Sequence, residues 1–251
     1  MTAKLDIVIP VLNEERDLPT CVDKLREFLD RRLSGCDWRV VIADNGSTDS
    51  TLDVARRLSG QHSRVGYIRL EQRGRGRALR RAWLESEADI VAYMDVDLST
   101  DLGAFPELID AIDGEGYDIA IGSRLKKGAH VIRRSLKREI ISRAYSGIFR
   151  TMFLAGFHDA QCGFKALSRR AVQDIVPLVE DSGWFFDTEL LILAERNGYR
   201  IKEVPVRWTD DPDTRVKVIS TAYEDMKGLL RLRFGGVGKA SRRLAERDRT
   251  E

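Results

Sequence analysis

The sequence predicts an α/β fold with a mainly parallel sheet flanked by helices. Short apolar runs of strand length alternate with longer segments in which apolar residues recur every three or four positions. Polar turn residues follow most of the runs, as expected where parallel strands lead into crossover helices. Of the 251 residues, 43% are hydrophobic and 33% charged, which is the balance of a globular chain.

The first half of the chain contains a regular alternation of strands and helices. We expect strands at 5–10, 38–43, 65–70, 89–94 and 117–122, and helices at about 15–32, after the turn at 44–47, and at 74–85. The first helix has one apolar face, made by Leu18, Val22, Leu25 and Leu29. Ser47 or Asp49 is placed to cap the second helix.

The second half begins with a different pattern. From 131 to 154, arginines and lysines interleave with isoleucines, phenylalanines and other apolar residues. This composition favours an amphipathic helix in a membrane interface, and the alternative is a core helix with a solvated basic face. A second interfacial candidate is 226–234, and it is followed by a basic segment, 239–249.

Composition excludes several classes of protein. The 42 basic and 40 acidic residues leave a net charge of +2, too small for binding nucleic acid through bulk charge. The three cysteines form no CxxC pair, so we expect neither a disulfide framework nor a zinc ribbon. No apolar run is long enough to cross a bilayer, and no secretory signal is visible, so we expect a cytoplasmic protein.

Polar residues follow the first, second and fourth expected strands. Ligands bind at the carboxyl ends of strands in open α/β sheets, so these residues indicate one crevice and a nucleotide as the natural ligand. Asp95 and Asp97 follow the fourth strand as alternate residues. Such a pair could hold Mg²⁺ or Mn²⁺ that bridges substrate phosphates, or it could be two solvated acids at the start of a loop.

Seven motifs in order resemble family 2 glycosyltransferases of the GT-A fold. In the first half these are Ile9-Pro10-Val11-Leu12-Asn13-Glu14-Glu15, Ala43-Asp44-Asn45-Gly46-Ser47 and the Asp95/Asp97 pair, with Gly122-Ser123-Arg124 beyond them. The second half is similar to polyprenyl-phosphate glucosyl- or mannosyltransferases through Asp159-Ala160-Gln161-Cys162-Gly163-Phe164-Lys165, Phe186-Asp187-Thr188-Glu189-Leu190 and Glu203-Val204-Pro205-Val206-Arg207-Trp208.

The resemblance implies a donor site in the first half. Pro10, Asn13 or Glu14, and Asp44 would hold the base and ribose, while Asp95 and Asp97 would hold Mg²⁺ or Mn²⁺ on the diphosphate. Asp44 and Ser47 also suit a turn and a helix cap. Arg75, in a Gly-rich turn that opens a helix, could reach a phosphate or could be a solvated arginine.

The acceptor side follows from the same resemblance. Arg124, Arg138 and Arg215 match positions associated with acceptor or donor phosphate, with Ser142 as a neighbour that could join them; the alternative for Arg138 is a solvated arginine. Asp159 and Gln161 suit recognition of sugar hydroxyls. Asp159 or Glu189 could serve as a catalytic base, and Asp187 could contact the reacting centre or cap a helix.

We therefore expect a GT-A domain over 1–225, with a nucleotide-binding half at about 1–122, an acceptor half at about 123–225, and a basic amphipathic tail at 226–251. The expected reaction is metal-dependent, inverting transfer of a hexose from UDP-glucose or GDP-mannose to polyprenyl phosphate. The protein would lie peripherally on the cytoplasmic face of a membrane, with a membrane-protein partner as an option. The alternatives are transfer to a hydroxyl acceptor, a nucleotidyltransferase, and an inactive nucleotide-binding or scaffold protein.

Overall fold

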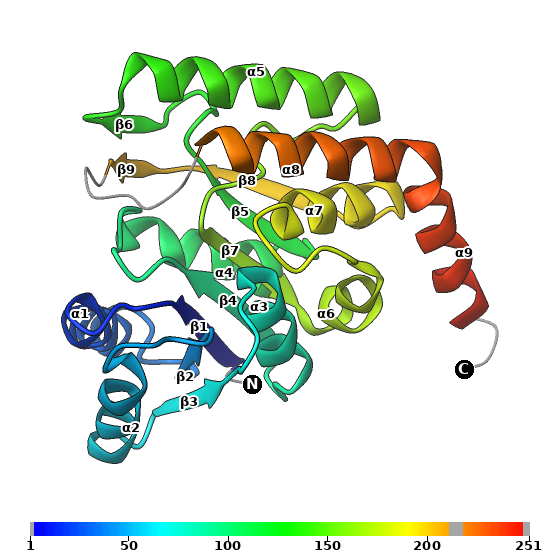
Figure 1. The fold of residues 1–251 in the computed structure, drawn as a ribbon. Helices are drawn as coiled ribbons and strands as arrows, with labels where there is room; N and C mark the ends of the chain where they lie inside the picture. Colours follow the sequence, from blue (N-terminus) through cyan, green and yellow to red (C-terminus); the bar gives the residue numbers. More distant parts are fainter. Residues whose placement is uncertain (1–2, 211–217, 248–251) are drawn as a thin grey trace.

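The structure is a computed structural model that describes residues 3–210 and 218–247. Its main sheet has seven strands in the order β3-β2-β1-β4-β7-β5-β8, and β6 and β9 form a separate pair (Figure 1). Within the main sheet β7 is antiparallel to β4 and β5, and the other pairings are parallel. The strands are β1 (Lys4–Val11), β2 (Asp37–Asp44), β3 (Val65–Arg69), β4 (Ile90–Met94), β5 (Ile119–Ser123), β6 (His130–Ile132), β7 (Phe164–Ser168), β8 (Ile201–Pro205) and β9 (Arg207–Thr209).

Helices cover both faces of this sheet. They are α1 (Asp17–Arg32), α2 (Thr51–Gln61), α3 (Arg75–Leu84), α4 (Phe105–Asp113), α5 (Leu136–Phe153), α6 (Arg169–Ile175), α7 (Phe186–Arg196), α8 (Val218–Arg231) and α9 (Val237–Arg247), with short turns η1 (Leu102–Ala104), η2 (Val176–Leu178) and η3 (Leu232–Gly236). The described part of the chain has no helix with the length and apolarity needed to span a membrane.

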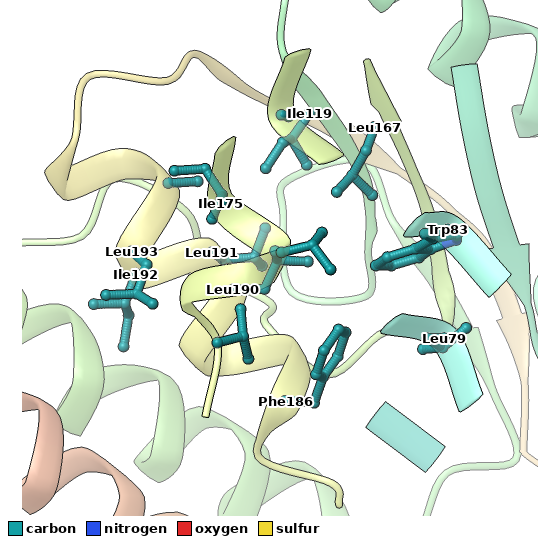
Figure 2. Packing of buried hydrophobic residues seen from close by; sticks show 14 of the residues in the cluster. Leu79, Trp83, Ile119, Leu167, Ile175, Phe186, Leu190, Leu191, Ile192 and Leu193 are labelled. Atoms are coloured by element: carbon teal, nitrogen blue, oxygen red, sulfur yellow. The ribbon is translucent and has the colours of Figure 1, made fainter. Parts of the chain in front are cut away.

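Two hydrophobic clusters form the core, one on each face of the sheet. Because successive strand side chains point to opposite faces, Ile7 and Ile9 of β1 pack with α1 and α4 while Val8 packs on the other side. On that other side, the ring of Trp83 lies 5.9 Å from the ring of Phe186, which joins α3 to α7 (Figure 2). The α/β prediction is confirmed, and the expected strands of the first half lie within two residues of the observed ones.

Of the two residues predicted to cap α2, Asp49 contacts the first residue of the helix and Ser47 does not. The hydroxyl of Ser47 accepts the N–H of Asn13 instead of capping α2, which begins only at Thr51. The carboxylate of Asp49 accepts the N–H of Thr51 at 3.0 Å. The polar turn after β2 is therefore used mainly to bind the loop after β1.

The basic and apolar segment, predicted as one helix over 131–154, begins in β6 and forms the helix α5 only from Leu136; this helix has a buried side and exposed apolar residues, and its place in a membrane interface stays a prediction. Phe149 and Phe153 of α5 are buried in the core. Leu136, Ile140 and Ile148 are exposed at spacings of four and eight residues, which puts them on one face. The side chain of Leu136 is 82% exposed. We call Leu136, Ile140, Ile148 and Leu154 the α5 apolar face.

The C-terminal elements pack onto the domain. The expected boundary between 225 and 226 falls inside α8. In α9, Ala240 and Leu244 belong to the core. Phe234, in the kink between α8 and α9, and Tyr223 of α8 are exposed. Figure 1 shows α8 running along α5, on the same side of the sheet as α7.

Candidate functional site

The tips of β2, β1 and β4 lie next to one another, as the sequence predicts. The three strands are adjacent and parallel, so the loops after them leave the sheet at the same edge. The N–H of Asn45 donates to the carbonyl of Val11, which binds the loop after β2 to the end of β1. This edge is the place where ligands bind in open α/β sheets.

The loops after β1 and β2 hold each other through side-chain hydrogen bonds. Asn13, with φ of 58°, accepts the N–H of Thr48 through its amide oxygen at 2.8 Å. The N–H of Glu14 donates to the hydroxyl of Thr51. Pro10 lies one residue before the end of β1, beside Ala43 of β2. These contacts place the three predicted nucleotide-binding residues of the first motif at one loop junction.

Asp44 is fully buried at the end of β2. One carboxylate oxygen accepts the N–H of Ser47 at 3.0 Å, and the other is paired with Arg69. The turn role considered for Asp44 is therefore present in the structure. Its contact with a ribose stays a prediction.

Asp95 projects from the end of β4 between an arginine and a glycine. One carboxylate oxygen lies 2.8 Å from the guanidinium of Arg75. A Cβ on Gly163 would lie 1.8 Å from the other oxygen, so only glycine leaves room for this carboxylate. The N–H of Asp95 also donates to the carbonyl of Gly163. The side chain of Asp95 is 46% exposed, so the cradle is open to a ligand.

These residues fit a divalent cation that takes some of its ligands from the protein and the rest from a substrate. Asp97 is exposed two residues after Asp95, and one of its carboxylate oxygens accepts the N–H of Ser99. Within residues 3–210 and 218–247, no cluster of three or more carboxylate, imidazole or thiolate ligands is found. Mg²⁺ and related hard cations are commonly held by one or two carboxylates, with water and phosphate oxygens completing the shell.

Arg75 joins the exposed Asp95 to a buried charge network. Its guanidinium also lies 2.6 Å from a carboxylate oxygen of Asp187. The other oxygen of Asp187 lies 3.0 Å from Nζ of Lys165 and accepts the hydroxyl of Tyr93 at 2.6 Å. Arg75 is thus a structural partner of Asp95 rather than a solvated arginine.

The neighbours of Asp187 and Arg75 keep both side chains in their charged forms. Burial acts to raise the pKa of Asp187, but Lys165 and Arg75 outweigh burial and hold that pKa below its usual value. Burial lowers the pKa of Arg75, and the groups around it, with Tyr93 first and then Asp95 and Asp187, bring it well above the ordinary value. Asp187 caps no helix, because α7 has no side-chain cap.

A second arginine–carboxylate pair forms the other side of the site. Nε of Arg124 lies 2.7 Å from one carboxylate oxygen of Asp159, and a terminal guanidinium nitrogen lies 2.9 Å from the other. Trp208 of β9 lies beneath this pair, with its ring 5.4 Å from the guanidinium carbon of Arg124 and 5.7 Å from that of Arg134. The structure therefore pairs two residues that the sequence assigned to different ligands.

The remaining predicted acceptor residues have partners of their own. Arg138 is paired with Asp210, and the hydroxyl of Ser142 accepts from Arg134. Arg215 lies outside the described residues. Their binding of the acceptor phosphate stays a prediction.

Gln161 and Glu189 both contact α8. The amide nitrogen of Gln161 donates to Asp225 at 2.7 Å. The carboxylate of Glu189 is buried and accepts from Arg231 at 2.6 Å and from the N–H of Asp181 at 2.8 Å. Glu189 therefore fastens α7 to α8, and its use as a catalytic base has no support in these contacts.

Sequence reasoning missed three side chains at the site. Tyr93 and Lys165 are fully buried in the network behind Asp95, and Trp184 lies with its ring 5.0 Å from the Arg75 guanidinium carbon. Lys165 carried a signal, since a lysine inside a buried apolar strand needs an anionic partner. Tyr93 and Trp184 carried none, because strands and loops of any fold contain such aromatics.

Comparison with known proteins agrees with this geometry. The sequence model of glycosyl transferase family 2 matches residues 6–176. The chain belongs to this family. That match covers β1 to α6 and includes the loops at the tips of β1, β2 and β4.

The related proteins extend the match into the second half. Glycosyltransferase AglD of Haloferax volcanii is 37% identical over 217 residues, which are 86% of this chain but 35% of AglD, so the chain spans about a third of that protein. A dolichyl-phosphate beta-glucosyltransferase of Dictyostelium discoideum is 29% identical over 92% of this chain and 74% of its own length.

A solved structure shows the same fold. Glucosyl-3-phosphoglycerate synthase from Mycobacterium tuberculosis, in complex with Mn²⁺ and UDP-glucose, superposes with a TM-score of 0.70 over 93% of this chain and 80% of its own chain, at 20% identity. This likeness confirms the predicted GT-A fold.

The Arg124–Asp159 pair makes the free energy of unfolding depend on pH in the acid range. Burial acts to raise the pKa of Asp159, but the charge and hydrogen bonds of Arg124 lower that pKa to about 2. A carboxylate with a depressed pKa stabilises the fold above its unfolded pKa of about 3.9 and loses that contribution as the pH falls toward 2. We expect Asp159→Asn to lower the free energy of unfolding at pH 7 by about 2 kcal/mol and to flatten its decline between pH 4 and pH 2. Urea unfolding at a series of pH values measures both effects, and a variant as stable as the wild type at pH 7 would contradict the assignment.

Proposed function

We propose that this chain transfers a hexose, glucose in the first instance, from a nucleotide sugar to polyprenyl phosphate and inverts the anomeric carbon. The observation that carries the proposal is the position of the α5 apolar face, which begins next to the basic residues at the Arg124 side of the site. Membership of family 2 and the likeness to dolichyl-phosphate beta-glucosyltransferases over 92% of this chain support it.

The donor half would be the crevice at the tips of β2, β1 and β4. Pro10, Asn13, Glu14 and Asp44 would hold the nucleoside, and Asp95 and Asp97 would hold Mg²⁺ or Mn²⁺. Such a cation, when bound, neutralises the charge that develops on a departing nucleoside diphosphate. Arg75 would keep Asp95 in place, since its guanidinium is itself fixed by Asp187.

The acceptor half would receive a second anion beside Arg124. The second ionisation of a phosphate monoester lies near pH 6, so at neutral pH the lipid phosphate already carries a nucleophilic oxygen. A protein base is then not required, which agrees with the structural roles found for Asp159 and Glu189. The acceptor phosphate would attack the anomeric carbon from the face opposite the leaving group, giving a β-linked product.

The entry side for a lipid would be a basic cavity of about 550 Å³ next to α5. Lys126, Lys127 and Arg143 contribute positive charge to it, and Val131 and Leu136 contribute apolar surface. Leu136 also belongs to the α5 apolar face. The same face would hold the protein peripherally on an anionic leaflet on the cytoplasmic side, alone or with a membrane-protein partner.

An acceptor panel tests the proposed reaction. With UDP-glucose or GDP-mannose and Mn²⁺, we expect sugar transfer to polyprenyl phosphate and none to soluble saccharides, measured by radiolabel in the organic phase for lipid products and in the separated saccharides of the aqueous phase. Asp95→Asn should lower the rate at least about 100-fold, because metal binding supplies several kcal/mol of charge stabilisation. Asp110→Asn, which changes an exposed acid on α4, is the matched control and should retain the rate. Transfer to a saccharide with no transfer to any lipid phosphate would contradict the proposal.

Vesicle sedimentation tests the α5 apolar face. Burying a leucine-sized side chain contributes about 1.5–3 kcal/mol, so we expect Leu136→Glu with Ile140→Glu to weaken binding to vesicles that contain anionic lipid at least about 10-fold. Leu84→Glu changes an exposed leucine of α3 instead and should bind as the wild type does. Equal binding of all three proteins would show that α5 is not the membrane contact.

A further inference from the structure

A buried carboxylate reaches the site from α8. Asp225 is 3% exposed, and one of its oxygens accepts from the amide nitrogen of Gln161 at 2.7 Å. Its second oxygen, also buried, has no hydrogen-bond partner within the described residues. Buried carboxylate oxygens are normally satisfied, so this arrangement calls for a specific explanation.

The surroundings of Asp225 are mostly acidic. Burial is the main reason why its pKa is raised to about 6; the hydrogen bond from Gln161 opposes the rise, and the charges of Asp181, Asp187 and Glu224 add to it. Asp225 is therefore expected to change between its neutral and ionised forms near pH 6. The titratable groups that interact with it are Tyr145 of α5, Asp181 in the loop before α7, Asp187 of α7, and Glu224 on its own helix.

Gln161 links this carboxylate to both halves of the site. It lies two residues after Asp159, whose carboxylate binds Arg124, and its N–H donates to that carboxylate at 3.2 Å. It also lies two residues before Gly163, which cradles Asp95. Gln161 therefore lies in the chain between the residue that binds Arg124 and the residue that contacts the predicted metal ligand Asp95.

We propose that Asp225 is a positioning residue that sets which end of the Gln161 amide faces the donor sugar. The inference rests on the proposed function, in which Gln161 recognises a sugar hydroxyl. An ionised carboxylate can only accept, so it draws the NH₂ group of the amide and leaves the amide carbonyl as the acceptor for the sugar. A protonated carboxyl can donate to the amide carbonyl, which lets the amide turn its NH₂ group toward the sugar instead.

The structure has the amide nitrogen of Gln161 on Asp225, as the ionised form requires. Above pH 6 the ionised carboxylate holds the amide in this one orientation, whereas below pH 6 the amide can also turn the other way. We therefore expect the sugar to bind more tightly above pH 6 than below it. Because one neutral hydrogen bond changes partners, the expected difference in dissociation constant is about 2- to 10-fold.

Equilibrium titration of wild type and Asp225→Asn from pH 5 to pH 7.5 tests the inference. UDP-glucose and GDP-mannose are each titrated with Mn²⁺ and without acceptor, and UDP serves as a ligand that lacks the sugar. Protonation of the ligand changes both dissociation constants equally. Its effect therefore cancels in the ratio of the wild-type dissociation constant to that of the variant. We expect this ratio to fall about 2- to 10-fold with rising pH for the sugar nucleotide that binds, and to stay constant for UDP.

Two further variants keep the test decisive. Gln161→Ala should abolish the pH dependence as Asp225→Asn does, and it replaces that variant if Asp225→Asn does not fold. Lys227→Gln removes an exposed charge from the same helix that is not among the groups acting on Asp225, and it should keep the wild-type profile. Sugar-nucleotide binding with a constant ratio would overturn the inference alone. Failure of both sugar nucleotides to bind at any pH would overturn the proposed function and the inference with it.

Discussion

The donor side of the site depends on one buried carboxylate with two cationic partners. Asp187 of α7 contacts Arg75 of α3 and Lys165 of β7, and the hydroxyl of Tyr93 from β4 completes the group. Removing one member of a buried ion pair costs about 3–5 kcal/mol, because the other charge is left without compensation. The network therefore fixes four elements relative to one another and holds Arg75 where it contacts Asp95.

The site keeps its charges close to neutral before any substrate arrives. Arg75 is matched by Asp95 and Asp187, and Arg124 is matched by Asp159. In the proposed function, a nucleoside diphosphate or a lipid phosphate would meet arginines whose orientation is already set, so less side-chain entropy would be lost on binding. Each anion would also have to share these arginines with carboxylates, so a cation on the exposed pair Asp95 and Asp97 would suit a site for two anions.

Local patterns were enough to predict β1 to β5 and the residues at their tips, but not β7 and β8, which complete the sheet. Short apolar runs predicted these strands, and the rule for open sheets placed Asp44 and Asp95 at the same edge of the sheet, where they are found on either side of β1. The pairings were not predictable, because Arg75 and Asp187 are 112 residues apart and Gln161 and Asp225 are 64 residues apart. Nothing near these residues in the chain indicates such partners, so only the tertiary fold shows that predicted ligands such as Asp159 and Arg124 bind each other.

The proposed reaction depends on a divalent cation shared between the protein and the diphosphate of the donor. Crystals soaked with UDP-glucose and Mn²⁺ test this claim most directly, through the anomalous scattering of manganese. We expect one strong anomalous peak in contact with the carboxylates of Asp95 and Asp97 and with the diphosphate, while the Asp187–Lys165 pair stays intact. A bound nucleotide with the manganese peak elsewhere, or with both carboxylates turned away from it, would contradict the account.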